Sequence, residues 1–369
     1  MTRGRELAEL AAGYDSGGGF GFRNRIINPA MVIDQRNAGA SVDTSNTAGV
    51  TYTIDRWVYR VLAASKFTIQ RNAGGLTGTN LPPGFTNYLG CTSSSAYSVT
   101  SGDTFNVWQA IEGFNVADLG FGSANAQTVT LSFWVRSSLT GTFSGAFRNE
   151  AGNRSYVFTY TISAANTWEQ KTVTIPGDTS GTWATGNGIG LHVQFSLGVG
   201  STFSTTAGSW QAGNFFGLST AVNVVSTNGA TFYITGVQLE KGSTATSFDY
   251  RDYGTELVRC QRYYYRVSGL NVTYGDASAH STTSAIVRTT FPVSMRVAPS
   301  ALDQTGTASN YAVFFVATAT ASSAVPTFRD AGTNLAQTTI TVASGLTGGQ
   351  AGFLYGNAAG AYLGWSAEL

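Results

Sequence analysis

Residues 248–262, FDYRDYGTELVRCQR, hold the densest group of side chains that could take part in chemistry. Two carboxylates roughly 5–10 Å apart can cleave a glycosidic bond, and Asp249 with Asp252 is a candidate pair. Arg251 stands between them, however, and a guanidinium beside a carboxylate favours ion pairing over proton donation. We therefore predict that Asp249, Arg251, Asp252 and Arg262 form a rigid joint between two modules, with subunit contact as part of that role.

Two other carboxylate pairs could be considered for glycoside cleavage, Asp34 with Asp55 and Glu112 with Asp118. Asp34 and Asp55 each precede an arginine by one or two residues, so we predict that they pin loops through ion pairs. The long repetitive pattern of a β-helix, which a depolymerase normally shows, is not visible in the sequence. The protein is therefore predicted not to be an enzyme, and a glycan depolymerase is the less favoured alternative.

The two histidines, His192 and His280, are the candidate bases for a hydrolase triad. In the segment GLHVQFSLG, His192 alternates with Leu191 and Val193, so on a strand it shares the opposite face with Gln194. No G-x-S-x-G nucleophile elbow is present. We predict an ordinary surface histidine at position 192, or a ligand-facing one if its sheet is concave.

The two cysteines, Cys91 and Cys260, are too few for a disulfide framework or a zinc site, and we predict free thiols. No metal site and no cofactor is predicted, because the chain lacks a D-x-D-x-D-G calcium loop. The alternative left open is a structural calcium that staples loops, with oxygen ligands drawn from Asp34, Asp55, Asp103, Glu240 or Asp249.

Seven tryptophans offer flat apolar faces of the kind on which sugar rings stack. In TVTLSFWVRS, Trp134 is out of phase with Leu131 and Phe133 and so points away from their face. Trp183 and Trp210 lie in loops rich in Gly, Ser and Thr. We predict Trp134, Trp183 and Trp210 as glycan-binding residues; the alternative is that they cap sandwich edges or meet a neighbouring subunit.

The composition argues against several classes of partner. The 369 residues carry a formal net charge of +1, which provides no electrostatic attraction for nucleic acid or an anionic membrane. No apolar stretch is long enough for a spanning helix, and the first residues lack the apolar core of a signal peptide. With 11% charged residues and 45 glycines, the chain is typical of a turn-rich β protein built for the exterior.

Apolar and polar residues alternate along most of the chain from residue 24 onward. TVTLSFWVRS, SYVFTYTIS and GLHVQFSLG have a period of two and are separated by turn clusters, which is the pattern of antiparallel strands. We predict an all-β protein with an antiparallel jelly-roll sandwich over residues 24–250 and a second, smaller β-sandwich module over residues 251–369. Early in this second module, TELVRCQR predicts one or two helical turns with Thr255 as the cap.

The first 23 residues stand apart from the rest. RELAELAA begins at Arg5 and places Leu7 and Leu10 on one stripe of a short helix. Two helical turns are not stable alone in water, and GYDSGGGFGF behind them is a flexible connector. We predict that residues 1–23 are a docking peptide and linker that binds through Arg5, Leu7 and Leu10; a frayed terminus, or a helix packed on its own domain, is the alternative.

Six segments, in this order along the chain, resemble a family of virion proteins of tailed bacteriophages: NRIINPAMVIDQRN, YTIDRW, LSFWVRSSLTGTF, NTWEQKTVTIPGDTSGTW, GVQLEKGSTATSFDYRDYGTELVRCQRYYYR and FPVSMRVAPS. Members of this family are tail-fibre-like appendages with a carbohydrate-binding-type jelly roll. The resemblance implies a homotrimeric structural protein that docks to other virion proteins by its N-terminus and attaches to host surface polysaccharide. It also implies synthesis in the host cytoplasm, location in the virion and no membrane insertion.

The same features fit a second kind of virion protein. A capsid decoration or head-fibre protein would use the N-terminal peptide to bind the shell and would not need to bind sugar. The position of the chain on the particle separates this alternative from a tail fibre.

Overall fold

A computed structural model describes residues 23–369, and the regular secondary structure of this part of the chain consists almost entirely of antiparallel strands. The predicted all-β fold class is confirmed. The docking contacts predicted at Arg5, Leu7 and Leu10 lie outside the described residues. In the described part of the chain, no helix has the length and apolar character needed to cross a bilayer.

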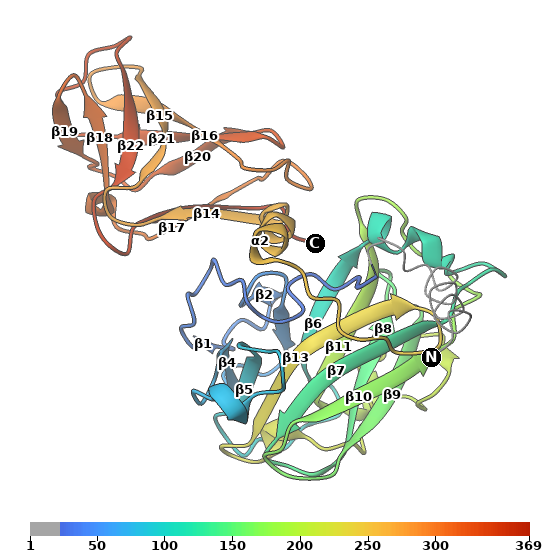
Figure 1. The fold of residues 1–369 in the computed structure, drawn as a ribbon. Coiled ribbons are helices and arrows are strands. Elements are labelled where there is room, and N and C mark those ends of the chain that lie inside the picture. The colour runs from blue at the N-terminus through green and yellow to red at the C-terminus, as the bar shows by residue number, and fades with distance from the viewer. Residues whose placement is uncertain (1–22) are drawn as a thin grey trace, which may run out of the picture. The chain divides into compact units, whose positions relative to one another are not determined.

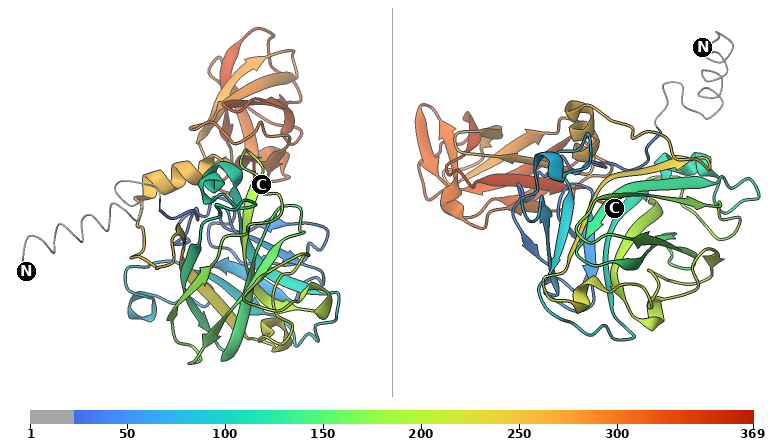
Figure 2. Two further views of the ribbon diagram at one scale, coloured as in Figure 1. Left: turned by 90° about the vertical axis from the view of Figure 1, so that its right-hand side faces the viewer. Right: turned by 60° about the horizontal axis from the view of Figure 1, so that its bottom comes forward.

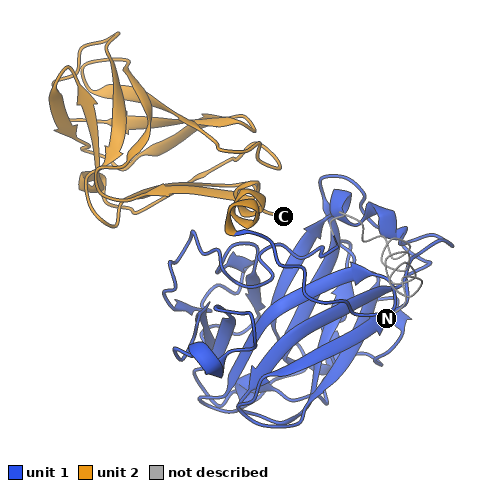
Figure 3. Ribbon diagram, in the orientation of Figure 1, with its two compact units in different colours: residues 1–252, 369 blue, residues 253–368 orange. Residues whose placement is uncertain are grey.

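The chain divides into two compact units (Figure 3). The first unit ends at Asp252 and also includes Leu369, and the second unit comprises Tyr253–Glu368. The division therefore falls after residue 252, whereas the sequence pattern places it after residue 250.

Two antiparallel sheets make up the first unit (Figure 1). The first sheet has the order β1 (Val42–Asp43), β4 (Phe67–Arg71), β5 (Leu89–Ser93), β13 (Thr231–Lys241), β7 (Val129–Ser137), β10 (Glu169–Ile175). The second sheet has the order β12 (Trp210–Gln211), β9 (Ser155–Ile162), β8 (Gly141–Arg148), β11 (Ile189–Val199), β6 (Thr104–Glu112), β3 (Val58–Val61), β2 (Thr51–Tyr52). The connections include five short 3₁₀ turns: η1 (Gly78–Asn80), η2 (Gly113–Asn115), η3 (Ala117–Leu119), η4 (Ser201–Phe203), η5 (Val224–Ser226).

Strand β7 shows how the alternating pattern builds this sandwich. Leu131, Phe133 and Val135 are fully buried on one face, while Trp134 and Arg136 are half-buried on the other. The two sheets lie face to face, as Figure 2 shows, and the buried face of β7 contributes to the core between them. The direction predicted for Trp134, away from the core, is therefore correct.

Aromatic side chains from both sheets fill the core of the first unit. The ring of Phe133 lies 5.0 Å from that of Phe195 and 5.0 Å from that of Tyr160, and both contacts are edge-to-face. Burial of each such side chain contributes roughly 1.5–3 kcal/mol to stability. The sandwich is thus a rigid support for the loops at its ends.

The outer face of the second sheet is also covered. His192 and Gln194 are 3% and 1% exposed, because the segment 200–223 crosses this face. The amide Nε2 of Gln194 donates to the Phe215 carbonyl at 3.5 Å, and the Leu218 amide donates to Ser144 Oγ at 3.0 Å. The prediction of a surface histidine at position 192 is therefore wrong: the Trp108 ring lies 4.4 Å from the imidazole, and the covering segment closes the neighbouring part of the same face.

The second unit encloses its own core between a small and a large sheet. The small sheet has the order β14 (Tyr264–Ser268), β23 (Tyr362–Ser366), β17 (Leu302–Gln304). The large sheet has the order β19 (Thr318–Ala321), β18 (Tyr311–Phe315), β22 (Ala351–Gly356), β15 (Thr273–Ala279), β16 (Ser284–Thr290), β21 (Leu335–Thr341), β20 (Thr327–Ala331). A short 3₁₀ turn, η6 (Ala308–Asn310), precedes β18.

Helix α2 (Tyr253–Gln261) opens the second unit and packs through the buried side chain of Cys260. Thr255 is the third residue of this helix and not its cap, so the helix begins earlier than the sequence pattern predicts. Asp252 occupies the position before the helix, where an aspartate is among the favoured N-cap residues.

Asp103, in the turn before β6, provides a test of stability against pH. Its carboxylate accepts hydrogen bonds from Tyr97 Oη at 2.9 Å and from both the amide and the hydroxyl of Thr100 at 2.7 Å. Burial raises the pKa of this carboxyl, but the three hydrogen bonds outweigh burial and hold the pKa below its usual value. Asp103 thus stabilises the fold above the ordinary carboxyl pKa of about 4 and loses this contribution as pH falls through the lower folded value.

We expect Asp103→Asn to lower the free energy of unfolding of the first unit by about 1–3 kcal/mol at pH 7, because the asparagine accepts fewer hydrogen bonds. The difference from the wild-type protein should shrink as pH falls below about 4, because the carboxyl of the unfolded chain then binds a proton, and it should be lost below the lower pKa of the folded state. Urea denaturation at a series of pH values measures this. Asp276→Asn, at an exposed position, is the control, and a pH-independent difference for Asp103→Asn would contradict the account.

Candidate functional site

Two of the three predicted tryptophans come together at one end of the first unit. Trp183 lies in the loop between β10 and β11, Trp210 lies on β12, and their ring centroids are 5.4 Å apart. Trp134 lies in the other sheet, on β7, where its neighbours across the sheet are Gln170 and Thr235. Trp134 therefore does not belong to the site that Trp183 and Trp210 form.

Two further aromatic rings complete this cluster. Phe121 lies 5.0 Å from Trp183 and 5.8 Å from Trp210, and Tyr156 lies 5.4 Å from Trp210, all with edge-to-face geometry. We call Phe121, Tyr156, Trp183 and Trp210 the aromatic cluster. Phe121 and Tyr156 are not among the residues predicted from the sequence; the signal for Phe121 is an aromatic residue between two glycines in LGFGS, outside any strand.

Both indole groups are fixed by hydrogen bonds to one loop. Trp183 Nε1 donates to the Ser180 carbonyl at 3.1 Å, and Trp210 Nε1 donates to the Pro176 carbonyl at 2.7 Å. Both rings remain half-buried, so each keeps part of its surface in contact with solvent. A ligand that stacks on them does not have to order them first, which reduces the entropic cost of binding.

An ion pair holds the loop that carries these carbonyls. Arg154 Nε and Nη2 each donate to one carboxylate oxygen of Asp178 at 2.7 Å, which is a bidentate pair. The Asp178 carboxylate also accepts a hydrogen bond from the Ser180 amide at 3.0 Å. The backbone carbonyl of Asp178 accepts one from the Gly122 amide at 2.7 Å. Asp178 therefore joins the loop of Trp183 to the loop of Phe121.

Glycine is required where these two loops meet. Gly122 has φ of +84°, and a Cβ there would lie 2.6 Å from the Gly181 carbonyl oxygen and 3.1 Å from Trp183. Gly181 has φ of +81°, and a Cβ there would lie 2.5 Å from Cγ of Arg154. Side chains at these positions would be strained and would displace the aromatic cluster.

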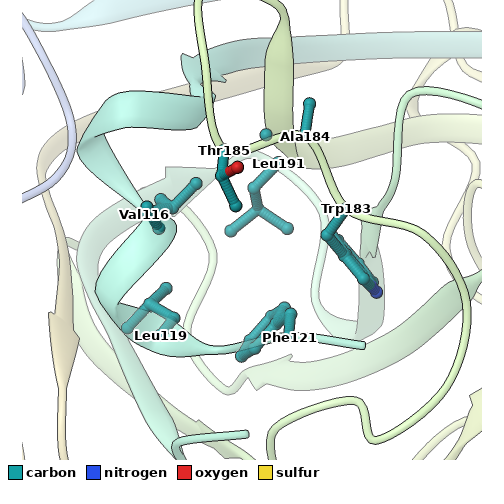
Figure 4. Close-up of a pocket in the computed structure, with 9 residues that line it drawn as sticks. Val116, Leu119, Phe121, Trp183, Ala184, Thr185 and Leu191 are labelled. Atoms are coloured by element: carbon teal, nitrogen blue, oxygen red, sulfur yellow. The ribbon is translucent and has the colours of Figure 1, made fainter. Parts of the chain in front are cut away.

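A small hollow opens beside Trp183 and Phe121 (Figure 4). Apolar side chains such as Val116, Leu119 and Leu191 line most of it, and Thr185 is its polar side chain. Its volume of about 10 Å³ is close to the space that one water molecule needs. A sugar ring therefore cannot enter the hollow and would have to lie across the aromatic faces at its rim.

Polar groups flank the aromatic cluster. Thr185 is exposed, and the guanidinium of Arg154 uses Nε and Nη2 for Asp178, which leaves Nη1 for a ligand. Flat apolar faces with a few hydrogen-bonding groups at their edge are suited to a pyranose, whose faces are apolar and whose rim carries hydroxyls. Such an arrangement is suited to binding a sugar by stacking.

The other carboxylates considered for catalysis are engaged in local structure. The Asp34 carboxylate accepts hydrogen bonds from the Asn37 and Gly39 amides at 2.9 and 2.6 Å and lies 4.0 Å from Nε of Arg71. The Asp55 carboxylate accepts the Gln35 amide at 2.7 Å. Asp34 thus pins its loop through backbone amides, and Asp55 holds the segment at Gln35.

The third carboxylate pair consists of two residues in different surroundings. Glu112 is buried at the end of β6, whereas Asp118 is exposed and forms an ion pair with Arg25 at 2.8 Å. Neither of them contributes to the aromatic cluster.

The candidate calcium ligands are dispersed over several elements. In residues 23–369, no group of three or more His, Cys, Asp or Glu side chains is placed to hold a metal ion. Glu240, for example, accepts hydrogen bonds from the amide and hydroxyl of Thr246 at 2.9 and 2.7 Å.

Asp249 and Arg251 tie the exit of the first unit to its first described residues. Arg251 donates to the Ile26 carbonyl at 3.0 Å and to the Asn24 carbonyl, and its Nε lies 3.8 Å from Asp249. The Asn24 amide in turn donates to the Asp249 carboxylate at 3.4 Å. These contacts lie within the first unit, so the residues brace that unit.

The other two residues of the predicted joint lie on either side of the division. Asp252 ends the first unit, while Arg262 belongs to the second, where its guanidinium lies 6.0 Å from the Tyr263 ring. A rigid joint between the units stays a prediction.

We expect Arg251→Ala to lower the free energy of unfolding of the first unit by about 2–4 kcal/mol. The guanidinium is largely buried, and its loss leaves two buried carbonyls without their charged donor. Urea denaturation followed by tryptophan fluorescence measures the loss. Arg329→Ala, at an exposed site, is the control, and equal stability of the two variants would contradict the bracing role.

The second unit also carries aromatic rings on an outer sheet face. Phe314 of β18 is directly opposite Phe353 of β22, and their rings stack at 5.3 Å, with Tyr355 at 6.1 Å from Phe353. Stacking between side chains of neighbouring strands stabilises a sheet, and this role explains why the rings lie here. We therefore place the candidate site at the aromatic cluster of the first unit.

Comparisons with known proteins find only distant likenesses. No protein-family model and no curated sequence matches the chain. Similar solved structures include tailspike protein 4 of bacteriophage CBA120, in its enzymatically active domain, with 13% identity and a TM-score of 0.32 over 59% of this chain. The match covers 21% of that tailspike chain, about a fifth of its length.

Carbohydrate-binding modules are also similar. A family 61 module, TmCBM61, solved with β-1,4-galactotriose has 8% identity and a TM-score of 0.30, over 60% of this chain and 100% of the module. A family 11 module from Clostridium thermocellum has 12% identity and a TM-score of 0.25, over 57% of this chain and 100% of the module. At such low identities and TM-scores, these likenesses assign no function to the chain.

Proposed function

We propose that the protein is a non-catalytic virion appendage that binds host-surface glycan through the aromatic cluster of its first unit. The observation that carries the proposal is the pairing of Trp183 with Trp210. Two half-exposed indoles, 5.4 Å apart and each fixed by a hydrogen bond, form a rigid apolar surface with polar groups at its edge. This is the combination that a sugar needs from a protein surface.

The proposal assigns no turnover to this site. The carboxylate nearest the aromatic cluster in the loop, Asp178, is held by both guanidinium bonds of Arg154 and by the Ser180 amide. Both oxygens of this carboxylate are engaged by these donors, which commits the side chain to the support of the loop. Binding without cleavage is therefore the expected chemistry.

Incubation of the full-length protein with purified host surface polysaccharide tests both statements. We expect retention of the protein on the immobilised polysaccharide and no increase in reducing ends. An absence of retention would refute glycan binding, and new reducing ends would refute the non-catalytic role.

The location in the virion and the homotrimer belong to the same proposal and are supported by the resemblance to tail-fibre-like proteins. The proposal holds that the N-terminal residues around Leu7 and Leu10 dock the chain to other virion proteins. Labelling of the first unit on intact particles, viewed by electron microscopy, should place it on the tail. Density on the capsid shell would instead establish the decoration role.

A further inference from the structure

Three polar side chains meet where the chain leaves β13, the last strand of the first unit. Gln238 and Glu240 lie on the same face of β13, and Thr246 reaches them after the turn that follows the strand. Gln238 is fully buried and Glu240 is 3% exposed, while Thr246 is half-buried. A hydroxyl, a carboxylate and a carboxamide are thus held together with little access to water.

The Thr246 hydroxyl lies between the other two groups. Its shortest hydrogen bond is donated to Oε2 of Glu240 at 2.7 Å, and its oxygen lies 3.3 Å from Nε2 of the Gln238 carboxamide. A hydroxyl that donates to a carboxylate has a base beside it, which is the arrangement that activates a nucleophile. The Thr246 amide also donates to Oε1 of Glu240 at 2.9 Å and so helps to fix the carboxylate in this position.

The Gln238 carboxamide is polarised for reaction with this hydroxyl. Its Oε1 accepts a hydrogen bond from the Asp249 amide at 2.8 Å, and this donor would stabilise negative charge on the oxygen when a nucleophile adds to Cδ. Its Nε2 donates to Oε1 of Glu240 at 2.9 Å. A single carboxyl group therefore contacts both the oxygen that would attack and the nitrogen that would leave.

We propose that Thr246 and Gln238 join in an ester bond that the folded protein forms by itself. Thr246 Oγ1 bonds to Cδ of Gln238 and gives its proton to Glu240. The bond between Cδ and Nε2 of Gln238 then breaks, Glu240 passes the proton to the nitrogen, and one ammonia leaves for each ester formed. The reaction is independent of the proposed glycan binding and occurs once in each chain.

The ester would close residues 238–246 into a ring at the exit of the first unit. The segment that follows β13 is held to the strand by hydrogen bonds such as those of Thr246 and Asp249. A covalent bond at this point would prevent a pulling force on the chain from peeling the segment off the strand.

The mass of the full-length protein tests the proposal directly. Loss of ammonia lowers the mass by about 17 Da for each ester. We expect mass spectrometry of the intact chain to show this loss after the folded protein has been incubated until its mass is constant. A mass equal to that of the unmodified chain would overturn the proposal.

Tryptic digestion locates the bond. Trypsin cleaves after Lys241, so Gln238 and Thr246 fall in separate peptides, 172–241 and 242–251. We expect the two peptides to remain joined and to separate on treatment with alkaline hydroxylamine, which cleaves esters. Separate peptides before this treatment, or a joined pair that hydroxylamine leaves intact, would contradict an ester.

Variants identify the hydroxyl and the base. Thr246→Val removes the hydroxyl with little change of shape, Glu240→Gln removes the base, and both variants should keep the full mass. Thr246→Ser retains a hydroxyl and should still lose ammonia, as should the matched control Thr244→Val, at an exposed threonine nearby. If Thr246→Val loses the same mass as the wild-type protein, the ammonia comes from another site and the proposal is wrong.

Discussion

Replacing Trp183 and Trp210 together by alanine is expected to abolish retention of the protein on host polysaccharide. Each indole presents part of its face to solvent and is fixed by its own hydrogen bond, at 3.1 and 2.7 Å. Central aromatic contacts of this kind typically lose about 2 kcal/mol or more on truncation, which is about 30-fold in affinity for each residue. Affinity for a polysaccharide fragment should be measured by calorimetry on the two single variants and the double variant.

The matched control for this prediction is Trp134→Ala. Trp134 is equally half-buried, but it lies on the other sheet, so its removal should leave the affinity for glycan unchanged. Circular dichroism of all variants confirms that the β-sandwich is retained. If the double variant binds as tightly as the wild-type protein, the aromatic cluster is not the glycan site.

Asp178→Ala is expected to give the largest loss of stability among the variants considered, about 3–5 kcal/mol for the first unit. Asp178 is 1% exposed and accepts two guanidinium hydrogen bonds at 2.7 Å, so its removal leaves the partly buried charge of Arg154 unpaired. Removal of the carboxylate also frees the Ser180 amide, next to the carbonyl that orients Trp183. We therefore expect weaker glycan binding as well as lower stability.

Denaturation by urea, followed by tryptophan fluorescence, measures this loss. Glu150→Ala removes an exposed carboxylate and should change the stability by less than about 0.5 kcal/mol. A second variant, Arg154→Ala with Asp178→Ala, should regain part of the stability, because it removes both charges. If Asp178→Ala is as stable as Glu150→Ala, the ion pair does not support the site.

The all-β architecture could be predicted from the sequence because side chains on a strand alternate with a period of two. Along β7, this alternation is enough to assign Phe133 to the core and Trp134 to the outer face. Sequence alone does not show whether the outer face of a sheet is exposed to solvent or covered by another segment. His192 is on the predicted face but is buried, because the Trp108 ring packs against it and a segment that follows β11 covers the adjacent Gln194.

The candidate site could be predicted only in part, for a related reason. Trp183 and Trp210 were identifiable as aromatic residues in polar loops, but their contact depends on how three loops meet at the end of the sandwich. Phe121 and Tyr156 complete the aromatic cluster from a turn and from an adjacent strand, and local sequence does not indicate that they meet. The start of α2 was misplaced because Thr255 and Asp252 are both favourable caps, and local propensity does not choose between them.

The most direct test of the account is the structure of the full-length protein bound to a fragment of its host polysaccharide. The account predicts a sugar ring stacked on Trp183 or Trp210 at the rim of the hollow, with Thr185 or Arg154 in contact with its hydroxyls. A sugar bound on the face of Trp134 or on the second unit, with the aromatic cluster unoccupied, would contradict it.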